Sequence, residues 1–203
     1  MEDIANRRPL RSRKTRWATA LARLLLRTRI TPNAISVAGI GFAAAGAACF
    51  ACASRSPLLW LGGAAFVQLR LLANLMDGLV AMEGGRKTPT GALFNEFPDR
   101  IEDSLLLIAA GYGAGVPVLG WAAALMAMGT AYVRALGGSI GLPQDFCGPM
   151  AKQHRMALLT AGAIASLWAA VMPWVLGAIG AGAAITAVRR TVRQARALTA
   201  AAR

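Results

Sequence analysis

The stretch from Asn74 to Asp103 concentrates the residues of this chain that can do chemistry. It reads NLMDGLVAMEGGRKTPTGALFNEFPDRIED and holds six of the nine Asp and Glu residues, and long apolar sequences flank it on both sides. A charge at the centre of a bilayer costs about 2.5–3.5 kcal/mol on insertion scales. Carboxylates packed between apolar helices therefore need a compensating partner, and we expect bound divalent cations or a cationic substrate.

The spacing of the polar residues places them on two helical faces. Asn74 and Asp77 are three residues apart, and Asn95, Asp99 and Asp103 follow at intervals of four, so each set shares one face of a helix. Carboxylate and amide oxygens suit magnesium or manganese. Such ions stabilise a departing pyrophosphate in an in-line displacement. The pattern therefore predicts a metal-dependent transferase that acts on a lipid-linked nucleotide at a membrane face.

The composition is that of an integral membrane protein. Of 203 residues, 56% are hydrophobic and only 15% are charged, whereas soluble domains carry about 25% charged residues. The apolar blocks are long enough to span a bilayer, which takes about 20 residues. We expect an all-α polytopic membrane bundle of six transmembrane helices, in a domain from 31 to 203 that follows a basic segment from 1 to 30.

Proline, glycine and polar residues divide the apolar sequence into six spans. Pro32 suits the start of the first span, because a proline in the first turn lacks an N–H that the helix does not need. For the same reason Pro98 is expected in the first turn of the third span, with Asn95 as its N-cap. The expected spans are approximately 34–53, 58–82, 95–115, 117–136, 154–172 and 174–188.

The segment from Lys14 to Arg29 has a different pattern, in which Trp17 and several leucines alternate with arginines. This predicts an amphipathic helix that lies in the membrane interface with its arginines toward phosphates. The alternative is a short helix packed on the bundle.

Charge gives the expected orientation and argues against nucleic-acid binding. The net charge is +13, but nine of the 22 Lys and Arg residues precede Thr31 and five lie from Arg189 onward, beside apolar segments. The positive-inside rule then places both termini and the acidic stretch in the cytoplasm, at a bacterial inner membrane. Basic flanks also attract membrane lipids, and faces rich in Gly and Ala permit a homodimer.

The central stretch resembles the motif of the CDP-alcohol phosphatidyltransferase family, D-x2-D-G-x2-A-R-x8-G-x3-D-x3-D. The motif residues that this chain keeps in register are Asp77, Gly78, Ala81, Gly91 and Asp99. It departs from the motif at three positions, where Asn74, Met82 and Asn95 replace two aspartates and an arginine.

The resemblance implies roles for these residues. It assigns Mg²⁺ or Mn²⁺ binding to Asn74, Asp77, Asn95 and Asp99, and makes Asp99 the base that deprotonates the acceptor alcohol. Asn74 and Asn95 would bind metal through amide oxygens, each with one negative charge fewer than the aspartate of the motif. The residues that it assigns to the nucleotide are Asn74, Gly78, Ala81 and Gly91, with Arg86 or Lys87 in place of the missing arginine as a phosphate contact.

The implied reaction transfers a phosphatidyl group from CDP-diacylglycerol to an alcohol acceptor and releases CMP. Arg134, Lys152 and Arg155 could form a basic pocket for a phosphorylated polyol such as glycerol 3-phosphate or inositol phosphate. The departures from the motif leave open a degenerate member that binds nucleotide or lipid without turnover. A transporter that uses the intramembrane charges is a third possibility, disfavoured because the carboxylates cluster at one membrane face.

Overall fold

The computed structural model describes residues 15–28, 30–84 and 91–201, and every regular element in these ranges is an α-helix. The predicted all-α class is therefore confirmed for the part of the chain described. The helices are α1 (Arg16–Leu26), α2 (Pro32–Ala51), α3 (Leu58–Glu83), α4 (Gly91–Gly113), α5 (Pro117–Ser139), α6 (Lys152–Ala165) and α7 (Met172–Ala201).

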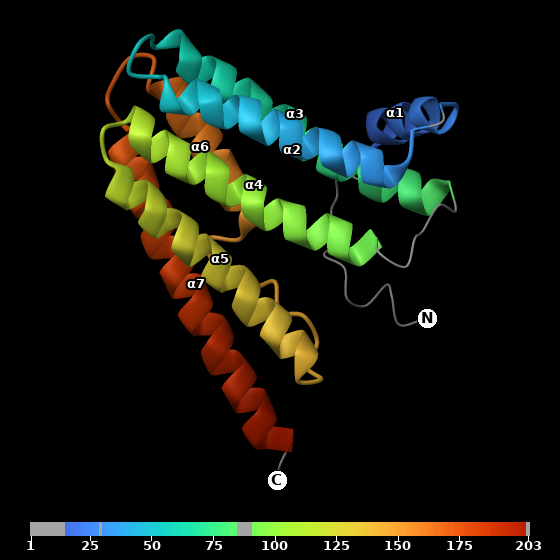
Figure 1. Cartoon of the computed structure of the whole chain (residues 1–203). Helices are drawn as coiled ribbons and strands as arrows, with labels where there is room; N and C mark the ends of the chain where they lie inside the picture. The colour runs from blue at the N-terminus through green and yellow to red at the C-terminus, as the bar shows by residue number, and fades with distance from the viewer. Residues whose placement is uncertain (1–14, 29, 85–90, 202–203) are drawn as a thin grey trace.

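The helices form two groups that meet at one end of the molecule. α2 packs against α3 and α4, α5 packs against α7, and α4 joins the groups by packing against α5, while α6 contacts α3 and α7. The groups converge at the end that carries the short turns 52–57, 114–116 and 166–171, and they diverge toward the other end (Figure 1). The longer connection from α5 to α6, residues 140–151, and helix α1 lie where the groups diverge.

Small residues allow α4 and α5 to approach one another closely. A Cβ added to Gly111 would lie 2.8 Å from Gly120 Cα, and backbone atoms cannot move aside as a flexible side chain can. Close approach through small residues stabilises helix pairs in membranes, where hydrophobic burial provides little force between helices. This contact holds the two groups together at the end opposite their divergence.

Four of the six expected spans satisfy the length and composition of a membrane-crossing helix: α2, α3, α5 and α7. Among the described residues, α4 and α6 do not, since α4 carries several charges in its first half and α6 has 14 residues. The sequence thus predicted the apolar helices correctly, and the count of six spans stays a prediction.

Two predicted helix boundaries are wrong, the start of the third long helix and the end of the span expected at 154–172. The third long helix begins at Gly91, so Asn95 lies inside it and is not its N-cap. Pro98 therefore lies in the helix interior rather than in the first turn. The expected span at 154–172 ends at Ala165, and α7 continues without a break into the basic tail, because nothing after Pro173 interrupts its helical pattern.

Helix α1 packs on the bundle through two small residues. Ala18 and Ala22 are buried in a cluster with Ala73, Met76 and Val80 of α3. Leu21, Leu25 and Leu26 also pack against this cluster, whereas Trp17 and Leu24 are more than half exposed. The packing agrees with the alternative reading of this helix, while its place in a membrane interface and the division at residues 30 and 31 remain predictions.

Candidate functional site

A cavity of about 510 Å³ lies between the diverging groups of helices. Its wall is apolar along α1 and α3, with Trp17, Leu71, Leu72 and Leu75. Its other walls bring the acidic residues of α4 against the basic residues of α5, α6 and α7. The charged and amide side chains that line the cavity are Gln68, Asn74, Glu96, Asp99, Arg100, Arg134, Lys152, Gln153, Arg155 and Arg190.

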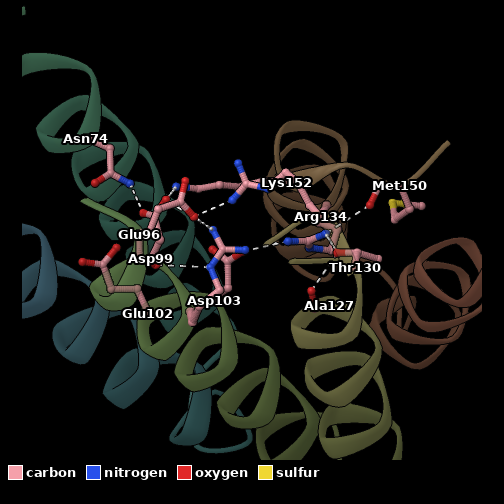
Figure 2. Close-up of polar contacts among 12 residues, drawn as sticks. Asn74, Glu96, Asp99, Glu102, Asp103, Ala127, Thr130, Arg134, Met150 and Lys152 are labelled. Atoms are coloured by element: carbon pink, nitrogen blue, oxygen red, sulfur yellow. Dashed lines mark hydrogen bonds and ion pairs between the residues drawn. The ribbon is translucent and has the colours of Figure 1, made fainter. Parts of the chain in front are cut away.

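Asp99 lies at the centre of the polar contacts. Its Oδ1 accepts a hydrogen bond from Asn74 Nδ2 and pairs with Arg70 at 3.1 Å. Its Oδ2 is 2.5 Å from Lys152 Nζ and 3.5 Å from an Arg100 nitrogen. Figure 2 shows Asn74 and the acidic side chains on one side of the site, with Arg134, Lys152 and Thr130 on the other. The predicted base and one predicted acceptor-binding residue are therefore in direct contact.

Arg70 is the buried counter-ion of the acidic stretch. Its side chain is fully buried, and it pairs with Asp103 at 2.8 Å and with Glu102 as well as with Asp99. Removing a partner from such a buried set is costly, because the remaining charges keep their desolvation penalty. The chain itself thus supplies much of the positive charge that we expected from a metal or substrate.

Arg155 extends this buried layer toward α5. It pairs with Asp103 Oδ2 at 2.9 Å and donates to Thr130 Oγ1 at 3.2 Å and to the Met150 carbonyl at 3.1 Å. Its side chain is 1% exposed. All three residues predicted to bind the acceptor line the cavity. Arg155, however, already uses its guanidinium for contacts within the protein.

Asp77 contacts α2 and is not part of the cavity lining. Its Oδ2 accepts a hydrogen bond of 2.7 Å from Ser36, and its Oδ1 is buried without a hydrogen-bond partner. Asp77, Gly78 and Ala81 are not among the described residues that line the cavity. The expected shared face therefore splits, since Asn74 reaches Asp99 while Asp77 reaches Ser36.

The described residues offer few oxygen ligands for a divalent ion. Outside the stretch 85–90 and the two chain ends, no group of three or more His, Cys, Asp or Glu side chains is placed to hold a metal. The free Oδ1 of buried Asp77 is an oxygen suited to a cation, and the Asn74 amide oxygen and Asp99 could add donors. Arg86 lies outside the described residues, and so does the side chain of Asn95. Gly91 is the first residue of α4.

Two basic residues that were not predicted from the sequence also line the cavity, Arg100 on α4 and Arg190 on α7. Arg190 donates to the Cys147 carbonyl at 2.9 Å and to the Thr130 carbonyl at 2.7 Å. It had been counted with the basic tail. A signal was present, because Thr186, Arg190 and Gln194 follow at intervals of four and all three are buried on one face of α7.

The segment 140–151 ties the basic residues together. Thr186 accepts a hydrogen bond of 3.0 Å from the Met150 backbone N–H. Asp145 pairs with Arg193 at 2.8 Å and accepts hydrogen bonds from the Cys147 N–H and thiol. Burial would raise the pKa of Asp145, but these hydrogen bonds and Arg193 lower it below its ordinary value. The segment is therefore anchored to α7 at both of its halves.

Comparison with known proteins agrees with this geometry. No family model matches the sequence. The chain is 35% identical to an archaetidylinositol phosphate synthase from Aeropyrum pernix over 175 residues, 80% of this chain and 87% of that protein. It is 28% identical to a phosphatidylinositol phosphate synthase from Streptomyces avermitilis over 193 residues, 88% of this chain and 78% of that protein.

Two solved structures of phosphatidylinositol phosphate synthase from Mycobacterium tuberculosis share the fold, each at 23% identity. The one in complex with manganese and citrate has a TM-score of 0.77 and covers 87% of this chain and 88% of its own. The one with CDP-DAG bound has a TM-score of 0.71 and covers 89% of this chain and 94% of its own.

Proposed function

Because this chain belongs to the CDP-alcohol phosphatidyltransferase family, we propose that it transfers a phosphatidyl group from CDP-diacylglycerol to a phosphorylated polyol. The chain is a membrane transferase of phospholipid synthesis. The observation that carries the choice of acceptor is the contact of Asp99 with Lys152 in a cavity that Arg134 also lines. A base and two cations in one cavity can hold a molecule with both a reactive hydroxyl and a phosphate.

The names of the relatives favour an inositol phosphate over glycerol 3-phosphate as the acceptor. Two of them are synthases of an inositol phosphate lipid. Arg134 and Lys152 would bind the acceptor's phosphate, and Arg190 would add positive potential from α7. An arginine binds phosphate oxygens through paired N–H groups. Arg155 would act by positioning Asp103 and the 140–151 segment.

In the proposed reaction, the acceptor hydroxyl oxygen attacks the β-phosphorus of CDP-diacylglycerol. The bond from that phosphorus to the bridging oxygen breaks, and CMP leaves with the bond electrons. Asp99 Oδ2 takes the hydroxyl proton, which requires Lys152 to move from that oxygen toward the acceptor. Lys152 and Arg70 compensate the charge of Asp99 before the acceptor arrives.

A divalent ion, Mg²⁺ or Mn²⁺, would neutralise the pyrophosphate and favour its cleavage. Asp77, Asn74 and Asp99 would hold it, with Asn95 as a further ligand. The substitutions at Asn74 and Asn95 remove two negative charges relative to the family motif, so we propose a single ion of modest affinity. Gly78, Ala81, Arg86 and Gly91 would contact the nucleotide.

The apolar wall suits the lipid part of the donor. Leu71, Leu72 and Leu75 of α3 lie beside Asn74, so an acyl chain could pass along α3 while the nucleotide reaches the polar end of the cavity. The charged part of α4 and the short α6 would complete a bundle of six spans, with termini and site in the cytoplasm of a bacterial inner membrane. Faces of small residues support a homodimer.

Product analysis tests this function. Purified protein with CDP-diacylglycerol, Mn²⁺ and a mixture of alcohols that includes inositol phosphate and glycerol 3-phosphate should release CMP and form one phosphorylated lipid, which mass spectrometry identifies. Asp99→Asn should form none. If neither protein releases CMP while both bind the nucleotide lipid, the degenerate, non-catalytic reading is correct. If Asp99→Asn matches the wild type, Asp99 is not the base.

A further inference from the structure

The Arg134 guanidinium is held from two sides of the cavity. Behind it, on the 140–151 segment, Gln144 Oε1 accepts a hydrogen bond of 3.1 Å from Arg134 Nη1, and the Phe146 ring centroid lies 5.3 Å from Arg134 Cζ. In front of it, on α4, Glu96 pairs with Nη2. The first two contacts come from the segment that follows α5, whereas the third crosses the cavity between α5 and α4.

The partners differ in how firmly they hold the guanidinium. The 140–151 segment is itself fixed to α7 through Met150 and Asp145, so Gln144 and Phe146 orient Arg134 whether or not a ligand is bound. The Glu96 side chain is 49% exposed. An ion pair with such an exposed partner contributes about 0.2–1 kcal/mol. Glu96 is therefore the partner that an anionic ligand can displace.

A second cation lies within reach of the displaced carboxylate. An Arg100 nitrogen is 3.9 Å from Glu96 Oε2, one turn along the same helix, and 3.5 Å from Asp99 Oδ2. When Glu96 leaves Arg134, Arg100 can pair with Glu96 and give up its contact with Asp99. The same exchange would then free one contact of the proposed base.

We propose that Glu96 occupies, on Arg134, the place of the acceptor's phosphate, and that it sets the affinity and selectivity of this subsite. The proposal rests on the proposed function, in which Arg134 binds that phosphate. A phosphate binds Arg134 through two oxygens and carries up to two negative charges, so it outcompetes one carboxylate. A neutral alcohol cannot displace Glu96. Arg134 then keeps its ion pair with Glu96, and Arg100 keeps its contact with Asp99, as in the free protein.

The test measures binding of inorganic phosphate to the purified full-length protein by calorimetry, which needs no turnover. Glu96→Gln keeps the size of the side chain and removes the competing charge, and it should tighten phosphate binding by up to about fivefold, the equivalent of 1 kcal/mol. Glu83→Gln is the matched control, since Glu83 is an exposed residue at the end of α3 outside the cavity lining, and it should bind phosphate as the wild type does.

Arg134→Gln and the double variant separate the possible failures. Arg134→Gln should weaken phosphate binding at least tenfold, and Glu96→Gln should add nothing in its presence, because Glu96 acts through Arg134. If Arg134→Gln binds as the wild type, the phosphate role of Arg134 in the proposed function is wrong. If Arg134→Gln weakens binding but Glu96→Gln does not tighten it, or tightens it equally in the double variant, the place-holding role is overturned. Should Glu96→Gln not fold, Glu96→Asp with its shorter carboxylate should give a smaller tightening, and unchanged binding there contradicts the proposal.

Discussion

The acidic wall on α3 and α4 and the basic wall on α5, α6 and α7 use their charges differently. On the acidic wall, the fully buried Arg70 neutralises Asp99, Glu102 and Asp103 from within the bundle. On the basic wall, Lys152 and Arg134 reach across the cavity to carboxylates, and Arg190 binds only backbone carbonyls in its described hydrogen bonds. The buried network around Arg70 is rigid, whereas a substrate can exchange the ion pairs that hold Lys152 and Arg134.

The largest expected effect concerns Asp99, which pairs both with the buried Arg70 and with Lys152 across the cavity. Asp99→Asn should lower kcat for CMP release by about 10²–10⁴, the usual contribution of a general base. Binding of CDP-diacylglycerol should change less than kcat does, and the unfolding temperature in detergent should fall, because buried Arg70 loses one of its carboxylate partners. Turnover equal to the wild type would show that the acidic wall has no part in proton transfer.

The contribution of the buried Arg70 network to stability can be tested with a variant of Arg70. Arg70→Met should lower the free energy of unfolding by about 3–5 kcal/mol, because it leaves buried carboxylates without their counter-ion. The measurement is denaturant unfolding in detergent.

Arg193→Met is the matched control for Arg70→Met. Its ion pair with Asp145 is on the surface, with a side chain 57% exposed, and its loss should cost about 0–1 kcal/mol. Equal losses for the two variants would mean that burial of the Arg70 network contributes nothing beyond a surface pair.

Whether Arg134 exchanges its ion pair for the acceptor's phosphate can be tested with a variant of Arg134. A charge-assisted hydrogen bond is worth about 1.5–3 kcal/mol, so Arg134→Gln should raise KM for the phosphorylated acceptor about 10- to 100-fold. KM for CDP-diacylglycerol should stay constant, because the donor binds along α3. A parallel rise of both KM values would assign Arg134 to the donor instead.

The smallest effect is expected from restoring a family residue. Asn74→Asp adds a carboxylate beside Asp77, so Mn²⁺ should stabilise the variant against heat at a concentration about threefold to tenfold lower than it does the wild type. Asn74→Leu removes the amide oxygen and should shift that concentration the other way. If neither variant moves it, the metal does not bind at this position of α3.

Much of the molecule could be predicted from the sequence. The apolar blocks predicted the α-helices, and the register of Asp77, Gly78, Gly91 and Asp99 indicated the family, which the relatives confirm. The wrong start of the third long helix is a local difference: α4 begins four residues earlier, at Gly91, and therefore carries Pro98 in its interior. The grouping of Arg134, Lys152 and Arg155 around one cavity also followed from the expected order of the spans.

Contacts between helices could not be predicted in the same way. Asn74 and Asp77 are near one another on α3, yet one reaches Asp99 on α4 and the other Ser36 on α2. The difference depends on how far α3 is rotated between its two neighbours, and helical spacing alone does not fix that rotation. Arg190 was missed for a similar reason, since its place depends on α7 running unbroken alongside α5.

The stretch from Asn74 to Asp103 shows where the two levels divide. The amino-acid pattern is enough to place carboxylates between apolar helices and to show that they need a counter-charge, because charge in an apolar setting is costly whatever the packing. Which groups supply that counter-charge depends on how the helices pack. Arg70 and Arg155 come from other helices, and packing alone brings them within hydrogen-bond distance of Asp99 and Asp103. It also left Asp77, among the described residues, with a buried oxygen that has no hydrogen-bond partner.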